Sequence, residues 1–347
     1  MEKILSINFK PFFTGYASHA NFDAIMSSTA QYKEWLFSNY IQLMSKKNFE
    51  VPHDLPLDFF IDIKRDNCYY LNNPYLYVQC IKKELVNTIC KDIVEFIIEA
   101  IDHDMYVDIC LNEYYIPVKN AYKRCCRPHN NMIYGYNKNK KCFYVVGYIQ
   151  HNANSFMGTY GAFRISFDVL SQAYKNCPYV DWFKSIYLYS VESHGGTLEK
   201  YRFNLEAVIR SLEDYLYSRN SLSNYYNIVP KTDRFSFGLD VYRDLLNNWD
   251  RGYYHMDDIR PLELLVEHKK CMVNRIVYLY SERYISKEDY EILYMKSYEI
   301  LKYALKARYI QIKYIISGRG DLSYYRKLLI EMPKLERDLY EGILLSL

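Results

Sequence analysis

Apolar residues recur at helical spacing in three segments near the start of the chain. The first begins after Ser18, the second covers Tyr32–Met44, and the third is a long stretch from Leu76 to His103. One face of an α-helix repeats every 3.6 residues, so this spacing predicts an amphipathic helix in each segment. Three prolines between the second and third segments predict a loop there: Pro52, Pro56 and Pro74.

The period then changes to two residues. Between Met105 and Leu111 apolar residues alternate with more polar ones, which predicts a half-buried strand that ends before Pro117. Two short runs, Met132–Tyr136 and Phe143–Tyr148, flank a polar stretch rich in Asn and Lys, which predicts an antiparallel hairpin. Two later runs are expected to extend this sheet: Phe163–Phe167 and Trp182–Val191.

After Gly195-Gly196 the pattern is almost wholly helical. Helices, then an antiparallel sheet, then more helices is an order typical of an α+β fold. It predicts a first domain over residues 1–195 and a helical C-terminal lobe over residues 196–347. Five helices are expected in the lobe: Leu198–Tyr217, Leu239–Trp249, Leu262–Glu282, Lys287–Ile316 and Leu322–Leu347.

Charge and composition argue against several classes of protein. The 44 basic and 41 acidic side chains leave a formal net charge of +3 without a concentrated basic stripe, so nucleic acid is not an expected partner. The chain has only 12 glycines and no phosphate-binding loop, so ATP is not expected. The apolar stretch Ile93–Ile101 contains Glu95 and Glu99, which indicates a core helix and not a membrane span.

The nine cysteines are scattered, odd in number and without a CxxC pair, so a disulfide framework and a zinc ribbon are poorly supported. The histidines also lack the spacing of metal ligands. The segment Met1–Asn8 is too short and too interrupted for a signal peptide. We therefore expect a cytoplasmic protein that binds no metal and no resident cofactor.

His129 is the first candidate for chemistry. It follows Pro128, precedes Asn130-Asn131 and stands just before the predicted strand Met132–Tyr136. A histidine where a polar loop enters a strand can reach into a cleft and act as a base. An ordinary surface histidine is the alternative.

Several motifs occur around and after this histidine. The stretch Asp108–Pro117 ends in an acidic-Tyr-Tyr-Ile-Pro run, Tyr122-Lys123 follows, and Gly135-Tyr136 closes the strand that His129 leads. Further motifs lie in the C-terminal lobe: Phe237–Tyr242, Asp258–Arg260 and Glu267–Met272. Together they resemble the butirosin biosynthesis protein H-like family, whose N-terminal domain is papain-like. The resemblance covers most of the chain and implies a papain-like cysteine protease fold, with helices packed on a twisted antiparallel sheet.

In that family the nucleophile is a cysteine directly after a histidine, at the head of the first long helix. The matching segment here is Ser18-His19-Ala20-Asn21, so Ala20 stands at the position of the cysteine. A helix N-terminus suits a nucleophile because its positive end lowers a thiol pKa and its backbone N–H groups can bind an oxyanion. Three explanations stay open: a Cys-to-Ala variant made to trap a bound acyl substrate, a natural non-catalytic member, or a shifted register that places the site at Ala17.

The third member of the implied triad also stays open. Family members often carry an aspartate on the strand after the histidine, where it holds the imidazole tautomer. Pairing across the hairpin brings Gly147 or Tyr148 to that position, and neither is a carboxylate. Asn137 replaces the aspartate of a Gly-Tyr-Asp motif, and Asp108 lies on the preceding strand. The candidates are Asp108, Asn137 and Tyr148.

The resemblance implies acyl transfer without ATP in nonribosomal, thiotemplated natural-product biosynthesis. An acyl group, presented as a thioester on the phosphopantetheine of an acyl or peptidyl carrier protein, would be attacked by a thiolate at residue 20 that His129 deprotonates. The acyl-enzyme would then pass the acyl group to a small-molecule amine and form an amide. A thioesterase or cysteine-peptidase-like hydrolase of the same pathway is one alternative, and a non-catalytic assembly-line interaction protein is another.

Basic residues near His129 suggest where a carrier protein would bind. They occur before the histidine and in the hairpin turn: Lys119, Lys123, Arg124, Arg127, Lys138, Lys140 and Lys141. They predict a docking surface for an acidic carrier, with a solvated face as the alternative.

Overall fold

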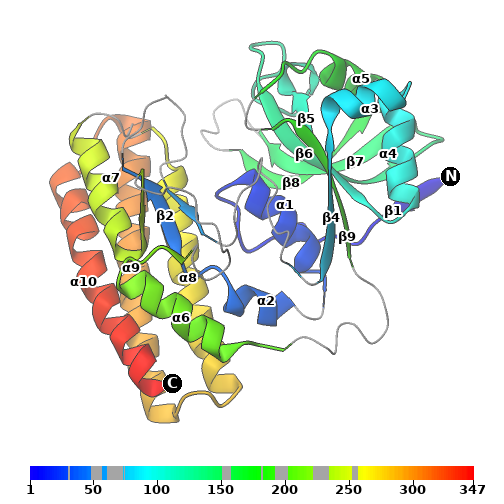
Figure 1. The fold of residues 1–347 in the computed structure, drawn as a ribbon. Helices are drawn as coiled ribbons and strands as arrows, with labels where there is room; N and C mark the ends of the chain where they lie inside the picture. Colours follow the sequence, from blue (N-terminus) through cyan, green and yellow to red (C-terminus); the bar gives the residue numbers. More distant parts are fainter. Residues whose placement is uncertain are drawn as a thin grey trace. The chain divides into compact units, whose positions relative to one another are not determined.

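The computed structural model describes residues 1–29, 32–47, 57–60, 73, 75–150, 158–180, 183–191, 202–221, 234–251 and 257–347. These residues form an α+β protein with a mostly antiparallel sheet and a helical C-terminal region, which confirms the predicted class (Figure 1). The chain divides into two compact units. Unit 1 contains Met1–Tyr32 and Lys64–Tyr201, and unit 2 contains Lys33–Ile63 and Arg202–Leu347. The predicted boundary at residues 195 and 196 lies outside the described residues.

Unit 1 is built around an antiparallel sheet with the strand order β4-β9-β5-β6-β7-β8, and β1 pairs with β6. The strand predicted over Met105–Leu111, the hairpin and the strand after it are confirmed as β5, β6–β7 and β8. The strands are β1 (Glu2–Ile4), β4 (Leu76–Lys82), β5 (Tyr106–Asn112), β6 (Pro128–Asn137), β7 (Cys142–Ile149), β8 (Thr159–Ser166) and β9 (Ser185–Val191).

Helices cover both faces of this sheet. Phe143 and Tyr148 are five residues apart on β7, so their side chains point to opposite faces. Phe143 packs against Phe167 at the start of α5 (Phe167–Lys175), whereas the hydroxyl of Tyr148 donates to the carbonyl of Thr14, just before α1 (Ala17–Met26). All seven residues of β5 are buried. The half-buried strand expected there was therefore wrong, because β5 lies between two layers of helix.

The long helix predicted from Leu76 to His103 was also wrong. This segment forms β4, then α3 (Lys83–Ile89) and α4 (Ile93–Asp102). β4 pairs with β9 over its whole length, from Leu76 opposite Val191 to Lys82 opposite Ser185. This long-range pairing overrides the helical spacing, since β-branched and aromatic residues fit either element. Asp92 caps α4 by accepting a hydrogen bond from the Val94 amide at 2.9 Å.

Unit 2 combines a short antiparallel sheet, in the order β10-β2-β3, with long helices. The predicted helix Tyr32–Met44 was too long, because α2 ends at Ser38 and β2 begins at Leu43. The predicted C-terminal helices are confirmed where the structure describes them; α6 begins at Leu205. The elements are α2 (Tyr32–Ser38), β2 (Leu43–Lys46), β3 (Leu57–Phe59), α6 (Leu205–Leu216), β10 (Phe235–Phe237), α7 (Val241–Asp250), α8 (Arg260–Ser281), α9 (Lys287–Ser317) and α10 (Leu322–Ser346).

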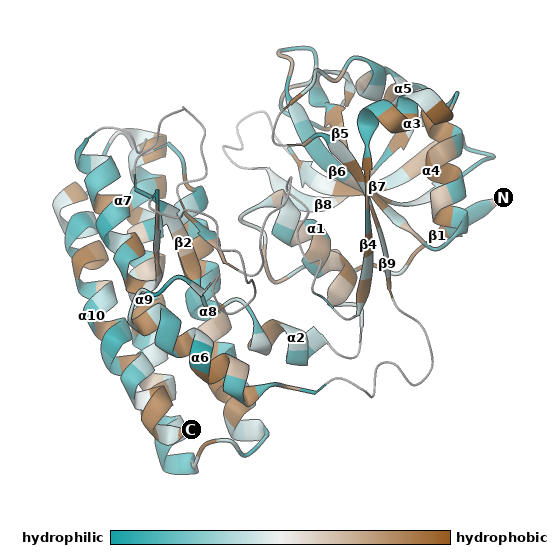
Figure 2. Ribbon diagram, in the orientation of Figure 1, coloured by the Kyte–Doolittle hydropathy of each residue, from teal (hydrophilic) through white to brown (hydrophobic). Residues whose placement is uncertain are grey.

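Hydrophobic residues gather in the strands of the larger sheet and on α4, shown in brown in Figure 2. The interior of unit 2 also contains charged side chains. Lys269 on α8 and Glu336 on α10 form an ion pair at 2.6 Å, and both side chains are almost completely buried. The hydroxyls of Tyr215 and Tyr242 also donate to Glu336. None of the described helices has the length and apolar composition needed to cross a bilayer.

Candidate functional site

Ala20 is the fourth residue of α1 and is completely buried. Its backbone N–H donates to the carbonyl of Tyr16 at 2.9 Å, so this amide is already used inside the helix. The Ala20 N–H itself is therefore not open to an oxyanion, and the role expected for the other backbone N–H groups of this helix N-terminus stays a prediction.

The next residue, Asn21, connects α1 to the sheet. Its Nδ2 donates to Asp108 Oδ2 at 3.1 Å, and the hydroxyl of Tyr160 donates to its Oδ1 at 2.9 Å. Asn130 on β6 lies 3.5 Å from the same Asp108 oxygen. Burial raises the pKa of the Asp108 carboxyl to about 7, although the two amides partly oppose this. Asp108 thus holds α1 against the sheet.

His129 is the second residue of β6. The pairing of β6 with β7 ends at Met132 opposite Val146, so His129 lies beyond that ladder. Its Nδ1 lies 3.1 Å from the carbonyl oxygen of Asn130, so Nδ1 carries the proton in the neutral ring. Nε2 makes no hydrogen bond to any residue that the structure describes. The side chain is 27% exposed.

The electrostatic surroundings keep the His129 ring neutral. Burial lowers the pKa of His129, and Lys119 and Arg127 lower it further, while Glu113 opposes them. A neutral imidazole with Nδ1 tied to a carbonyl presents the lone pair of Nε2, which is the state that a general base requires.

The three residues expected to complete a triad occupy different places. In the β5–β6 register His129 lies opposite Leu111 and Asp108 opposite Met132, so the two residues are three positions apart along the ladder and do not face each other as a pair. Asn137 lies at the other end of β6, about 26 Å along the strand, where its Oδ1 accepts the Lys140 amide of the hairpin turn.

Tyr148 is the one expected residue that touches His129. The two rings meet edge to face with their centroids 6.1 Å apart. The Tyr148 ring also contacts Tyr160 at 5.7 Å, and Tyr160 in turn bonds Asn21. This aromatic pair connects the His129 ring to α1, and no described polar or ring contact joins His129 directly to Ala20.

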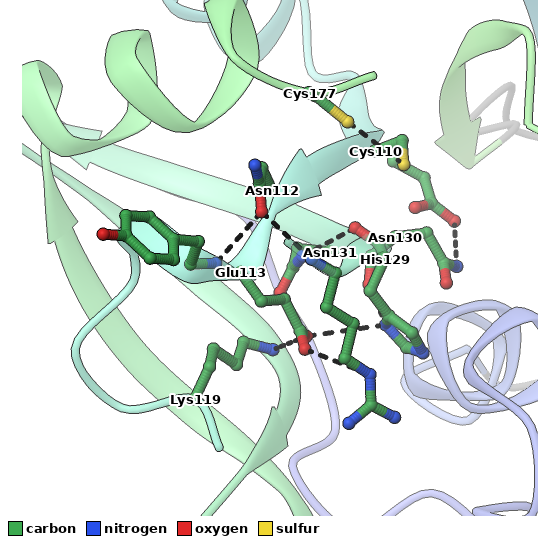
Figure 3. Close-up of polar contacts among 11 residues, drawn as sticks. Cys110, Asn112, Glu113, Lys119, His129, Asn130, Asn131 and Cys177 are labelled. Atoms are coloured by element: carbon green, nitrogen blue, oxygen red, sulfur yellow. Dashed lines mark hydrogen bonds and ion pairs between the residues drawn. The ribbon is translucent and has the colours of Figure 1, made fainter. Parts of the chain in front are cut away.

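The carboxylate beside His129 is Glu113, which was not among the expected site residues. Its Oε1 lies 3.8 Å from His129 Nδ1 and 3.2 Å from Lys119 Nζ, as Figure 3 shows. Its Oε2 lies 3.8 Å from Arg127 Nε. One buried carboxylate therefore faces three cationic or basic groups.

The local backbone explains why Glu113 turns back to this position. β5 ends at Asn112, whose side chain accepts the amides of Tyr114 and Arg127 at 3.1 Å each. A single 3-10 turn, Glu113–Tyr115, follows, and the Glu113 amide donates to the carbonyl of Arg127 at 2.9 Å. Glu113 is the acidic residue of the acidic-Tyr-Tyr-Ile-Pro run, and this motif was the sequence signal that could have identified it as a site residue. Strand alternation could not place it, because the strand ends one residue earlier.

The basic residues do not form one docking surface. Lys119 is buried, and its ammonium lies over the Phe163 ring at 4.8 Å beside Glu113, so the expectation that it helps to dock a carrier was wrong. The other residues are exposed but lie in two groups, one before β6 and one in the turn after it. These groups are Lys123, Arg124 and Arg127, then Lys138, Lys140 and Lys141.

Within the described part of the chain, no three His, Cys, Asp or Glu side chains are grouped so that they could hold a metal ion. No protein-family model matches the chain, and a search of curated proteins found no significant match.

Proposed function

We propose that unit 1 is a papain-like acyl-transfer module, in which His129 is the base and residue 20 is the position of the nucleophile. The observation that carries this proposal is the His129 side chain: a neutral ring with Nδ1 bound to a carbonyl, a carboxylate nearby and Nε2 unbonded. The order of a first helix followed by an antiparallel sheet, with the histidine where a strand begins, also supports it.

The substrate class is an acyl group carried as a phosphopantetheine thioester on an acyl or peptidyl carrier protein. With a thiol at residue 20, His129 Nε2 takes the thiol proton, and the thiolate attacks the thioester carbonyl and expels the carrier thiol. A small-molecule amine then attacks the new thioester, which releases an amide and restores the thiol. No ATP is required, because an amide is more stable than a thioester.

Ala20 has no thiol, so the chain with alanine cannot form the acyl-enzyme. It would hold the acyl thioester without turning it over. The second candidate function is a non-catalytic interaction protein that binds loaded carriers. The complete burial of the Ala20 side chain favours it. A hydrolase of the same pathway differs only in the acceptor, which would be water.

The test is to restore the thiol with Ala20→Cys and to mix the protein with carriers loaded with short aliphatic, long aliphatic or benzoyl groups. Intact mass should increase by one acyl group in the variant and stay unchanged in the starting protein. Adding amines should then release an amide from a transferase, whereas a hydrolase releases the free acid.

Two further cysteine variants on α1 provide matched controls. Ala24→Cys is equally buried but lies one helical turn farther from the N-terminus of α1, so it controls for burial and should not be acylated. Ala17→Cys tests the shifted register. His129→Ala in the Ala20→Cys protein should prevent acylation at neutral pH, with partial recovery at alkaline pH as the thiolate forms unaided. Acylation of Ala17→Cys or Ala24→Cys, but not of Ala20→Cys, would contradict the assignment of residue 20.

A further inference from the structure

Two cysteines of unit 1 lie close together although they are far apart in sequence. Cys110 is on β5, Cys177 follows α5, and their sulfur atoms are 3.6 Å apart (Figure 3). Both residues are buried and carry free thiols. A disulfide has sulfur atoms about 2.05 Å apart, so the two sulfurs need to approach by only about 1.5 Å.

The backbone around Cys177 is fixed on two sides. Asn112 Nδ2 donates to the carbonyl of Asn176 at 2.9 Å, and Lys83 Nζ donates to the carbonyl of Cys177 at 3.1 Å. Asn112 lies two residues after Cys110 on β5. The segment that carries Cys177 is therefore bonded to the strand that carries Cys110, which holds the two thiols in reacting position.

Cys177 also lies at a surface opening. It lines a cavity of about 800 Å³ together with residues of α3 and α5, among them Lys83 and Cys90. The hydrogen bond with Cys110 and the charge of Lys83 both lower the pKa of the Cys177 thiol, and a thiolate is the reacting form. Cys177 is therefore the thiol that a small oxidant meets first, and Cys110 lies behind it.

We propose that Cys110 and Cys177 form a reversible disulfide with a low-molecular-weight disulfide, such as oxidised glutathione, as the oxidant. The Cys177 thiolate attacks one sulfur of the oxidant and releases one small thiol. Cys110 then loses its proton and attacks Cys177 Sγ of the mixed disulfide, which expels the second small thiol. Two protein thiols are oxidised and one small disulfide is reduced to two thiols.

This bond would affect the candidate site through Asn112. The Asn112 side chain bonds the Cys177 segment through Nδ2 and the amides of Tyr114 and Arg127 through Oδ1. The turn that carries Glu113 lies directly after it. The proposal does not depend on acyl transfer, since it rests on the two thiols alone.

The experiment is to incubate the whole chain with oxidised glutathione, block the remaining thiols with N-ethylmaleimide and digest with trypsin. Cys110 and Cys177 fall on separate peptides, residues 92–119 and 176–184, and each of these peptides contains one cysteine. We expect a cross-linked pair of these two peptides, which disappears after treatment with dithiothreitol. The thermal midpoint of the oxidised protein should be several degrees higher, because the bond closes a long loop.

The variants separate this pair from the other thiols. Cys90→Ser removes a thiol of the same cavity and should leave the cross-link unchanged. Cys110→Ser should stop the reaction at the mixed disulfide, detected as one glutathione on peptide 176–184. If the unmodified chain gives no cross-linked peptide, or cross-links the exposed Cys125 or Cys126 to Cys177 instead, the proposal is wrong. The digest of the unmodified chain decides this even if a variant does not fold.

Discussion

At the scale of single residues, the site around His129 is organised by one carboxylate among several positive groups. Glu113 favours the protonated ring, whereas burial, Lys119 and Arg127 disfavour it. The three charged contributions can be removed separately, because Glu113, Lys119 and Arg127 are different side chains. The His129 pKa is therefore a direct measure of whether Glu113 faces the ring.

Replacing Glu113 should move the His129 pKa in a known direction. In Glu113→Gln the pKa should fall further below its ordinary value of 6.5, because the charge that favours imidazolium is lost. Lys119→Met should move it the opposite way. The measurement is titration of the imidazole nitrogens by NMR, with exposed Glu95→Gln on α4 as the control. A Glu113→Gln shift no larger than that of Glu95→Gln would contradict the arrangement.

Asp108 makes stability depend on pH. Its pKa is about 7 in the folded chain, against an ordinary value of 3.8 in an unfolded chain, so the folded state binds the proton more tightly. Stability from this group is complete below about pH 4 and is lost as the pH rises through 7. The loss is at most a few kcal/mol, at about 1.4 kcal/mol per pH unit.

The corresponding variant is Asp108→Asn, which cannot ionise and can still accept from Asn21. Urea midpoints at pH 5 and pH 7.5 should differ less in Asp108→Asn than in the unmodified chain. Burial also raises the pKa of Asp23, to about 6, and this contributes in the same direction. Asp23→Asn should therefore remove a separate part of the dependence of stability on pH. If the difference between the two urea midpoints is the same in Asp108→Asn as in the unmodified chain, the Asp108 carboxyl is not buried as described.

At the scale of elements, hydrophobic periodicity identified the helices and strands that pack against segments close to them in the sequence. The β6–β7 hairpin and the C-terminal helices were predicted, because a short turn or a continuous apolar face defines them locally. β4 was missed, since its spacing suits a helix and its partner β9 comes about a hundred residues later. In the site, His129 was found from its place at a strand start. Glu113 was missed because a one-turn 3-10 helix reverses the chain at that residue.

Two helices of unit 2 are joined by the buried pair Lys269 and Glu336. Burial lowers the pKa of Lys269, and Glu336 counteracts this. Glu336→Gln would retain an oxygen for the tyrosine hydroxyls but would leave Lys269 without its counter-charge. Such a change costs about 3 to 5 kcal/mol of unfolding free energy.

The double variant gives the control for this prediction. Lys269→Met with Glu336→Gln removes both charges of the pair, so it should be more stable than Glu336→Gln alone. Chemical denaturation of the unmodified chain, the two single variants and the double variant measures the differences. If the double variant is less stable than Glu336→Gln by the full cost of Lys269→Met, the two side chains are not coupled.

At the scale of the whole molecule, the exposed basic residues near β6 lie in two groups, one at each end of this strand. If an acidic carrier docks beside His129, Lys123→Glu with Arg124→Glu should weaken its binding by about tenfold at low salt and reduce the salt dependence. Lys138→Glu with Lys140→Glu changes the net charge equally, at the hairpin turn. Equal effects of the two pairs on the carrier dissociation constant would indicate net charge alone and no local docking surface.

The division of the chain into units also has a consequence for its synthesis on the ribosome. Unit 2 takes β2 from one segment and β10 from another, and Ser45 pairs with Ser236 about 190 residues later. At translation rates of about 5 to 20 residues per second, β2 waits roughly 10 to 40 seconds for this partner. During that time the strands of unit 1 are all made, so the nascent chain can close unit 1 while β2 still has an open edge. Residues 43–46 are therefore an unpaired strand edge, and a site for wrong pairing, until β10 is made.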